Sequence, residues 1–171
     1  TGTIVNNESA DILRMLNSAF DHLTGNTLNL YPQALAGTID ELNARIYTEL
    51  NNGVYQAGFA SSQAAYEEAY LRVFAMLDEL ESQLSDGRAY LLGDVLTETD
   101  IRTFVTLVRF DAAYHGLFKC NRNTLRSMEA LQSYMQRIAA LPAVAATVNI
   151  EHIKAGYYSV KALNPSGIVP L

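Results

Sequence analysis

Residues 96–121 read LTETDIRTFVTLVRFDAAYHGLFKCN, and this stretch decides the fold class. Thr97 and Asp100 have the spacing of a capping box, in which each side chain accepts a hydrogen bond from the other residue's free backbone N–H. The run from Ile101 to Phe110 is apolar nearly all round, which is typical of a helix in the middle of a bundle. The stretch therefore predicts a central buried helix that Thr97 and Asp100 cap and that Gly116 ends.

Helical periodicity continues on both sides of this stretch. Apolar residues recur every three or four positions in segments that short turns separate, and Thr38 with Glu41 predicts a second capping box. Asn7 is expected to cap the first helix, and Asn51-Asn52-Gly53 to end the second in a left-handed turn. The predicted helices cover about residues 9–16, 38–50, 62–84, 97–115, 127–140 and 143–156. The fold class is all-α, with room for one strand in the β-branched residues TGTIVN at the N-terminus.

The composition indicates one domain and excludes several classes of binding partner. The chain has 171 residues, about half of them hydrophobic, which is enough for one sizeable domain. Its formal net charge is −6 without a basic stripe, so nucleic acid is not expected as a partner. No apolar run reaches the ~20 residues that span a membrane. A single cysteine excludes an internal disulfide and fits a reducing compartment, so we expect a cytoplasmic protein.

The second half of the opening stretch resembles a catalytic cluster. Asp111 and His115 are four residues apart and share a helix face, so the carboxylate can orient the imidazole as a base, or can equally join the helix to a loop. Arg109 lies on a different side. Cys120 follows Gly116 in a predicted loop, where no helix N-terminus lowers its pKa. These residues are therefore interpreted as structure, and one cysteine with scattered histidines predicts no metal site.

The order of these segments resembles a known family. A short strand, Glu-Ser opening a helix and then an all-helical domain with a capped buried helix are similar to a glutathione transferase. ESADILRMLNSAFD, NNGVYQAGFASSQAAYEEA, residues 90–121 and TVNIEHIKAGYY resemble the glutathionyl-hydroquinone reductases, the Xi class of that superfamily, and the tail NPSGIVP fits as well. The likeness covers nearly the whole chain.

The resemblance implies a reaction and a domain organisation. The family reduces glutathionyl-hydroquinones: a cysteine attacks the glutathione sulfur and releases hydroquinone, and a second glutathione then regenerates the thiolate. That cysteine belongs to a Cys-Pro-Trp motif in a thioredoxin-like domain, and the chain has neither a Cys-Pro pair nor a tryptophan. We expect residues 1–20 to be the last strand and helix of that domain, and residues 21–171 to be the helical C-terminal domain. No catalytic residue is then expected in this chain, and the chain alone is expected to be inactive.

The resemblance also assigns binding residues, with glutathione as a substrate and without a metal. Glu8 and Ser9 would hold the γ-glutamyl end of glutathione, although from the residues alone a plain helix cap is the preferred explanation. Tyr55 and Tyr157 would line the hydroquinone pocket, with Tyr158 as the alternative to Tyr157. His152 and Lys154 also match the family pattern, and Lys154 could steer an anionic conjugate or be a solvated charge. The position of Gly156 usually holds a larger residue in the family.

The leading hypothesis is the substrate-binding and dimerisation domain of such a reductase, acting as a homodimer on glutathione and quinol conjugates. Two alternatives stay open. One is a non-catalytic transferase-like scaffold or binding module. The other is a transferase that conjugates glutathione to electrophiles, a choice that depends on the nucleophile in the preceding domain: Cys favours reduction, whereas Ser or Tyr favours conjugation.

Overall fold

A computed structural model describes residues 2–171 and shows a bundle of helices without a strand in that part of the chain. The described elements are α1 (Ser9–Ser18), α2 (Asp21–Thr24), η1 (Gln33–Leu35), α3 (Ala36–Ile46), η2 (Tyr47–Asn51), α4 (Gly53–Gly58), α5 (Gln63–Leu84), α6 (Glu98–Arg109), η3 (Phe110–Tyr114), η4 (Leu125–Ser127), α7 (Glu129–Ala139), α8 (Pro142–Ala145) and α9 (Ile150–Tyr158). The all-α class is confirmed. Residues 4–8 are not part of a strand, and Thr1 lies outside the described residues.

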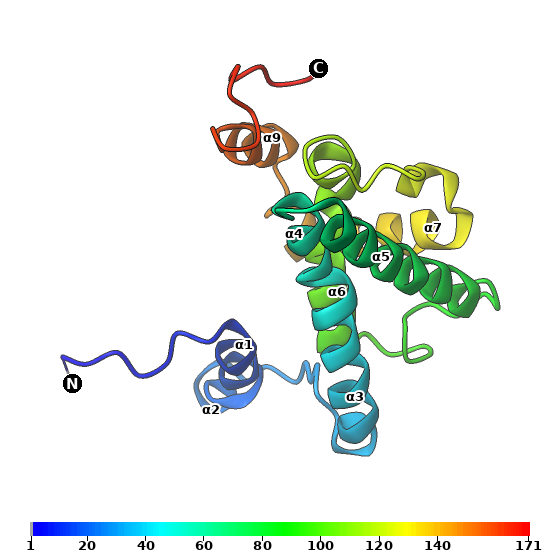
Figure 1. Ribbon diagram of the computed structural model, residues 1–171. Coiled ribbons are helices and arrows are strands. Elements are labelled where there is room, and N and C mark those ends of the chain that lie inside the picture. Colours follow the sequence, from blue (N-terminus) through cyan, green and yellow to red (C-terminus); the bar gives the residue numbers. More distant parts are fainter. Residues whose placement is uncertain (1) are drawn as a thin grey trace.

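The central helix forms as predicted. In α6 the Thr97 backbone N–H donates to Asp100 Oδ2 at 2.8 Å, and the Thr97 hydroxyl donates to the same oxygen at 3.0 Å. Asp100 Oδ1 accepts from the backbone N–H of Leu91 and from the hydroxyl of Tyr134, each at 2.9 Å. The cap therefore also fastens the preceding loop and α7 to the start of α6. Figure 1 shows α6 running beside α3, with α5 and α7 to one side.

The core is one cluster of apolar side chains to which α3, η2, α4, α5, α6, η3 and α7 all contribute. Ile46, Leu50, Val73, Leu77 and Leu80 are fully buried, as the periodicity of α3 and α5 predicts. Ser62 caps α5 by accepting from the backbone N–H of Ala65 at 3.2 Å. Gly58 allows α4 to approach the ring of Phe118, because a Cβ there would come within 2.4 Å of the ring.

Several predicted helix ends are wrong. Thr38 lies inside α3, which begins at Ala36 after the short helix η1, so Thr38 and Glu41 form no capping box. Asn52 has a φ of −85°, and the helix continues through the π-helical turn η2 into α4. The Asn51 side chain explains this continuation, because its amide donates to the Arg102 carbonyl and to Thr106 Oγ1 at 3.1 and 2.6 Å. It bridges to α6 and does not end a helix.

Two other boundaries also differ. The N-cap of α1 is Glu8, not Asn7; the Asn6 side chain instead accepts from the Glu8 backbone N–H at 2.7 Å. The last predicted helix is divided into α8 and α9, because Asn149 caps a new helix by accepting from the backbone N–H of His152 at 2.9 Å. Periodicity located these segments, but the local hydrogen bonds determined where each helix begins.

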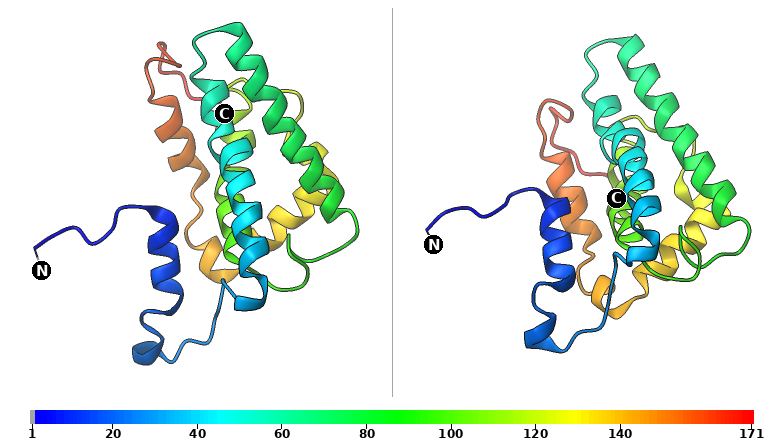
Figure 2. Two further views of the ribbon diagram at one scale, coloured as in Figure 1. Left: turned by 60° about the horizontal axis from the view of Figure 1, so that its bottom comes forward. Right: turned by 90° about the horizontal axis from the view of Figure 1, so that it is seen from below.

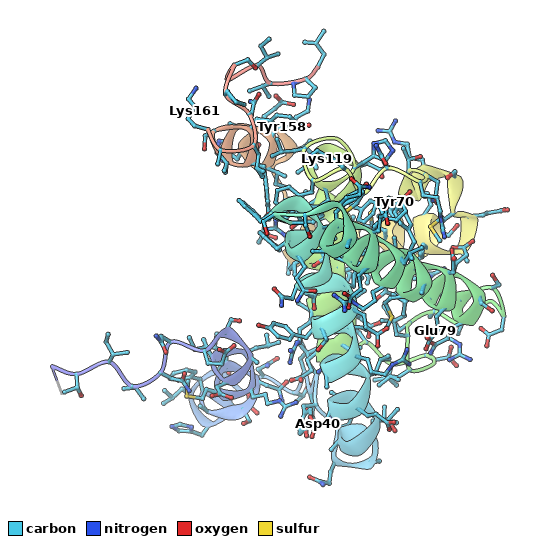
Figure 3. The ribbon with its side chains drawn as sticks, in the orientation of Figure 1. Asp40, Tyr70, Glu79, Lys119, Tyr158 and Lys161 are labelled. Atoms are coloured by element: carbon cyan, nitrogen blue, oxygen red, sulfur yellow. The ribbon has the colours of Figure 1, made fainter. Side chains whose placement is uncertain are left out.

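The first two helices lie to one side of the bundle, which the left view of Figure 2 shows most clearly. No side chain of α1 or α2 is buried. The connection from α1 to the bundle is polar: Arg14 donates to both carboxylate oxygens of Glu98, which is almost fully buried at the start of α6. Asp40, on the side of α3 toward α1 (Figure 3), accepts from Arg14 and from the hydroxyl of Tyr31. An ion-pair cluster therefore positions α1.

None of the helices in residues 2–171 combines the length and apolarity needed to cross a membrane.

Candidate functional site

A pocket of about 470 Å³ lies where the start of α1 meets η2, α4, α6 and α9. It contains all four residues that the sequence analysis assigned to binding, namely Glu8, Ser9, Tyr55 and Tyr157. These residues are separated by up to about 150 positions along the chain, so only the fold brings them together. The other lining residues are Tyr47, Asn51, Arg102, Val105, Thr106, Arg109 and Tyr114.

Three tyrosine hydroxyls form a chain in this pocket. The Tyr157 hydroxyl lies 2.6 Å from that of Tyr55 and 2.7 Å from that of Tyr114. The rings of Tyr114 and Tyr157 are perpendicular, with centroids 5.3 Å apart, and the ring of Tyr55 packs edge-on against Phe118. These aromatic contacts fix the ring orientations and hence the positions of the hydroxyls.

The number of protons on the three tyrosine hydroxyls limits the hydrogen bonds that they can donate to a ligand. Three hydroxyls carry three protons, and the two links between them use two. Tyr114 is buried with 2% of its surface exposed, whereas Tyr55 is 39% exposed. If Tyr114 donates to Tyr157 and Tyr157 to Tyr55, the third proton is on Tyr55 and points at the open pocket. If Tyr55 and Tyr114 both donate to Tyr157, the third proton is on Tyr157, which also lines the pocket. Only the reverse order, from Tyr55 through Tyr157 to Tyr114, would leave a donor facing the packed core, which is costly.

The electrostatics keep these phenols protonated. Burial, followed by the hydrogen bond that it donates to Tyr157, raises the pKa of Tyr114 well above its ordinary value. Burial raises the pKa of Tyr157 to about 12, and the hydrogen bond from Tyr114 opposes that rise. Neither group is ionised near neutral pH. Tyr114 and Tyr157 therefore act as hydrogen-bond donors and do not supply a phenolate base.

The position of Tyr157 rather than Tyr158 in the pocket follows from α9. Tyr158 is buried on another side of the helix, where a Cβ on Gly116 would lie 3.0 Å from its hydroxyl (Figure 3). Lys154 pairs with Glu151 at 3.7 Å and does not line the tyrosine pocket. His152 lines a second, adjacent pocket. Glu8 and Ser9 occupy the first turn of α1, at the edge of the tyrosine pocket.

The polar cluster of residues 109–120 divides into separate parts. Asp111 accepts from the backbone N–H of Leu125 at 2.8 Å, so it joins the π-helical turn η3 to a loop, which was one of the two interpretations. Cys120 is fully buried, and burial raises the pKa of its thiol to about 12. A protonated, inaccessible thiol is not a nucleophile. Within residues 2–171, no three His, Cys, Asp or Glu side chains are grouped so as to hold a metal ion.

The sequence analysis missed several pocket residues. Arg102, Val105, Thr106 and Arg109 recur at helical spacing and form one face of α6. Two arginines and a threonine on one face of a helix that is largely apolar after Asp100 are a signal that could have found them. Tyr114 was not assigned to the pocket, because its contact with Tyr157 joins residues 43 positions apart.

Comparison with known proteins shows which proteins the chain resembles. Residues 63–146 match the family "Glutathione S-transferase, C-terminal domain". This part of the chain is a glutathione S-transferase C-terminal domain. The glutathionyl-hydroquinone reductase PcpF of Sphingobium chlorophenolicum is 51% identical over 169 residues, which are 98% of this chain and 54% of that protein.

Solved glutathione S-transferases share the fold over the same extent. The glutathione-bound structure of YqjG, a glutathione transferase homologue from Escherichia coli K-12, has a TM-score of 0.96 at 48% identity and covers 99% of this chain and 55% of that one. Glutathione transferase Xi 1 from Trametes versicolor has a TM-score of 0.95 at 48% identity, with 99% of this chain and 60% of that one covered. The chain spans about half the length of the curated relatives that it matches.

Proposed function

We propose that this chain is the substrate-binding and dimerisation part of a glutathionyl-hydroquinone reductase. The observation that carries the proposal is the three-hydroxyl chain, which presents one free phenolic proton at Tyr55, beside Glu8 and Ser9, when it runs from Tyr114 through Tyr157 to Tyr55. A hydroquinone ring offers oxygen acceptors for that proton and a flat face for the aromatic walls. The names of the relatives support the same substrate class.

The role of the pocket in the reaction follows from the electron balance. In the ketone tautomer of the conjugate, the ring carbon that bears the sulfur already carries a proton. A thiolate outside this chain attacks the sulfur, the carbon–sulfur bond breaks, and its electron pair restores the aromatic ring as the hydroquinone phenolate, which takes up a proton and leaves. A second glutathione attacks the resulting mixed disulfide and releases glutathione disulfide and the thiolate. Negative charge spreads onto the ring oxygen in the first step, and a hydrogen bond from Tyr55 stabilises it there.

Glutathione would enter along the start of α1. The backbone N–H groups and the Ser9 hydroxyl suit the α-carboxylate of the γ-glutamyl end, and the Glu8 carboxylate suits its α-amino group. We propose residues 1–20 as the end of a thioredoxin-like domain and residues 21–171 as the helical domain. Figure 1 shows α1 and α2 together at one side of the bundle, which supports a separate N-terminal part. A cytoplasmic homodimer that uses glutathione and quinol conjugates completes the proposal.

The test is ligand-observed NMR titration of the chain with 1,4-dihydroxybenzene and with its glutathione conjugate. We expect weak binding of the ring, on the order of millimolar, because a small ligand recovers little free energy after its loss of motion. Tyr55→Phe keeps the aromatic ring but removes the free donor, and should weaken binding several-fold. Tyr157→Phe breaks both links and should have a similar effect.

Tyr66→Phe is the matched control, because the Tyr66 hydroxyl donates to the Lys119 carbonyl outside the pocket. Equal affinities for Tyr55→Phe, Tyr66→Phe and the unaltered chain would show that the hydroxyl chain binds no quinol. A chain that binds neither ligand would instead support the scaffold alternative.

A further inference from the structure

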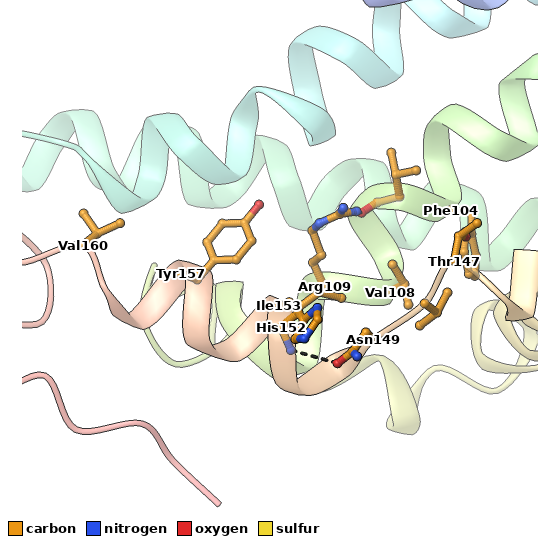
Figure 4. Close-up of a pocket in the computed structure, with 12 residues that line it drawn as sticks. Phe104, Val108, Arg109, Thr147, Asn149, His152, Ile153, Tyr157 and Val160 are labelled. Atoms are coloured by element: carbon orange, nitrogen blue, oxygen red, sulfur yellow. Dashed lines mark hydrogen bonds between the residues drawn. The ribbon is translucent and has the colours of Figure 1, made fainter.

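A second pocket of about 580 Å³ lies beside the tyrosine pocket, between α6 and α9 (Figure 4). Its walls are mainly apolar and include Phe104, Val108 and Ile153. It shares Val105, Arg109 and Tyr157 with the tyrosine pocket, so the two spaces meet along these side chains. Its volume is in the range that small-molecule sites occupy.

Arg109 is a cation without a carboxylate partner at this junction. Its guanidinium donates to the Val105 carbonyl of its own helix, and no Asp or Glu lines the second pocket. Arg102 lies about two turns earlier on the same face of α6. Its guanidinium is 3.7 Å from the carboxylate of Glu98, so its charge is already paired. The charge of Arg109 acts on Tyr157, whose pKa it lowers against the larger effect of burial. A guanidinium between apolar walls favours a carboxylate, which it can hold with two parallel hydrogen bonds.

Gly156 keeps the second pocket open. It lies within α9, and a Cβ built on it would meet no atom within 4 Å. The helix therefore has no packing need for glycine there, and glycine costs a helix about 1 kcal/mol relative to alanine. A larger side chain at this position would project into space that is now free.

We propose that the second pocket receives a ring substituent of the quinol and that Arg109 selects substituents that end in a carboxylate. This inference rests on the proposed function. The ring lies against Tyr55 and Tyr157 in the tyrosine pocket. Its side chain passes Val105 and Tyr157 into the second pocket, where its apolar part meets Val108 and Ile153. The preferred substrate class is thus hydroquinones with a short acidic side chain.

The test compares three ligands by NMR titration of the full chain: 1,4-dihydroxybenzene, 2,5-dihydroxyphenylacetate and the methyl ester of the latter. The acid and its ester have nearly the same size, so their difference isolates the charge. We expect the acid to bind about tenfold more tightly than the ester, as for one charge-assisted contact. In Arg109→Met this ratio should fall to about one.

Arg126→Met is the matched control, because Arg126 is exposed and lines neither of these two pockets. Its acid-to-ester ratio should equal that of the unaltered chain. Gly156→Leu should weaken both the acid and the ester relative to 1,4-dihydroxybenzene, because leucine would occupy the space of the side chain.

The outcomes separate this inference from the proposed function. An acid that binds no better than its ester, in a chain that still binds 1,4-dihydroxybenzene through Tyr55, would overturn the acidic substrate class and leave the proposed function standing. The acidic substrate class would also be overturned if the Arg109→Met variant still bound the acid more tightly than the ester. The same holds if that variant lost only its binding of glutathione. If no ring binds and Tyr55→Phe changes nothing, the proposed function fails as well. The comparison of acid and ester uses the unaltered chain, so its result does not depend on whether any variant folds.

Discussion

The Asp100 side chain connects the start of α6 to the preceding loop and to α7. Its carboxylate is fully buried and accepts four hydrogen bonds, from two groups of Thr97, from Leu91 and from Tyr134. A helix cap alone is worth about 1 kcal/mol, but here a loop and a second helix depend on the same two oxygens. The residue is therefore a structural centre of the domain.

Replacing Asp100 by Ala should lower the free energy of unfolding by about 3 kcal/mol or more, because four donors lose their acceptor in the core. For a chain of this length, that corresponds to a melting temperature lower by roughly 6–12 °C. Differential scanning calorimetry measures both quantities. Tyr134→Phe, which removes a single donor, should cost clearly less, and an equal cost for both would contradict this account.

Cys120 is the second residue whose environment decides its role. Its thiol is fully buried, and burial raises its pKa to about 12. At pH 8 almost none of it is thiolate, so iodoacetamide should modify it far more slowly in the folded chain than in urea. Mass spectrometry of timed samples measures this ratio. Fast modification of the folded chain, or turnover of a glutathionyl-hydroquinone by the chain with glutathione, would restore Cys120 as a candidate nucleophile.

At the scale of elements, the position of α1 depends on one buried carboxylate. Glu98 accepts from Arg14 and from the Asn43 side chain, and α1 buries none of its own side chains. The helix that bears Ser9 is thus attached by charge and not by apolar packing. Such an attachment fails when one partner is removed, because the other charge is left without compensation.

Arg14→Met should therefore release α1 while the bundle stays folded. We expect faster amide exchange in residues 9–18 and a change of at most about 2 kcal/mol in global stability, as measured by hydrogen-exchange mass spectrometry and urea unfolding. Arg72→Met is the comparison variant, because it removes an exposed ion pair with Glu68 within α5. If α1 exchanges at the same rate in both variants, another contact holds it.

At the scale of the whole molecule, ion pairs between elements make the fold sensitive to acid. Hydrogen bonds from arginines hold the pKa of Asp40, Asp78 and Glu79 below their ordinary values. For such groups the stabilisation is present above the unfolded pKa of about 4 and is lost as the pH falls through the lower folded value. Burial raises the pKa of Asp100 and acts in the opposite direction.

The three exposed pairs together should lose on the order of 1 kcal/mol between about pH 4 and pH 2. Urea unfolding across that range measures the loss, and 1 M NaCl should reduce it because salt screens exposed charges. A loss that is independent of salt would show that these exposed pairs do not cause the acid sensitivity.

The sequence by itself determined the fold class, the central helix with its cap at Thr97 and Asp100, and the long helix that Ser62 begins. These features depend on neighbours within a few residues, which periodicity and capping patterns report directly. It also singled out Glu8, Ser9, Tyr55 and Tyr157 through a resemblance, although not their geometry.

Only the tertiary structure decided which residues share a pocket. The chain of hydroxyls from Tyr114 through Tyr157 to Tyr55 joins η3, α9 and α4, and the unpaired charge of Arg109 is visible only once its neighbours are known. The helix likewise continues past Asn51 because the Asn51 side chain contacts α6, although the local sequence predicts a helix end there. Contacts between distant segments leave no local pattern in a single sequence, because their free energy appears only when the bundle closes.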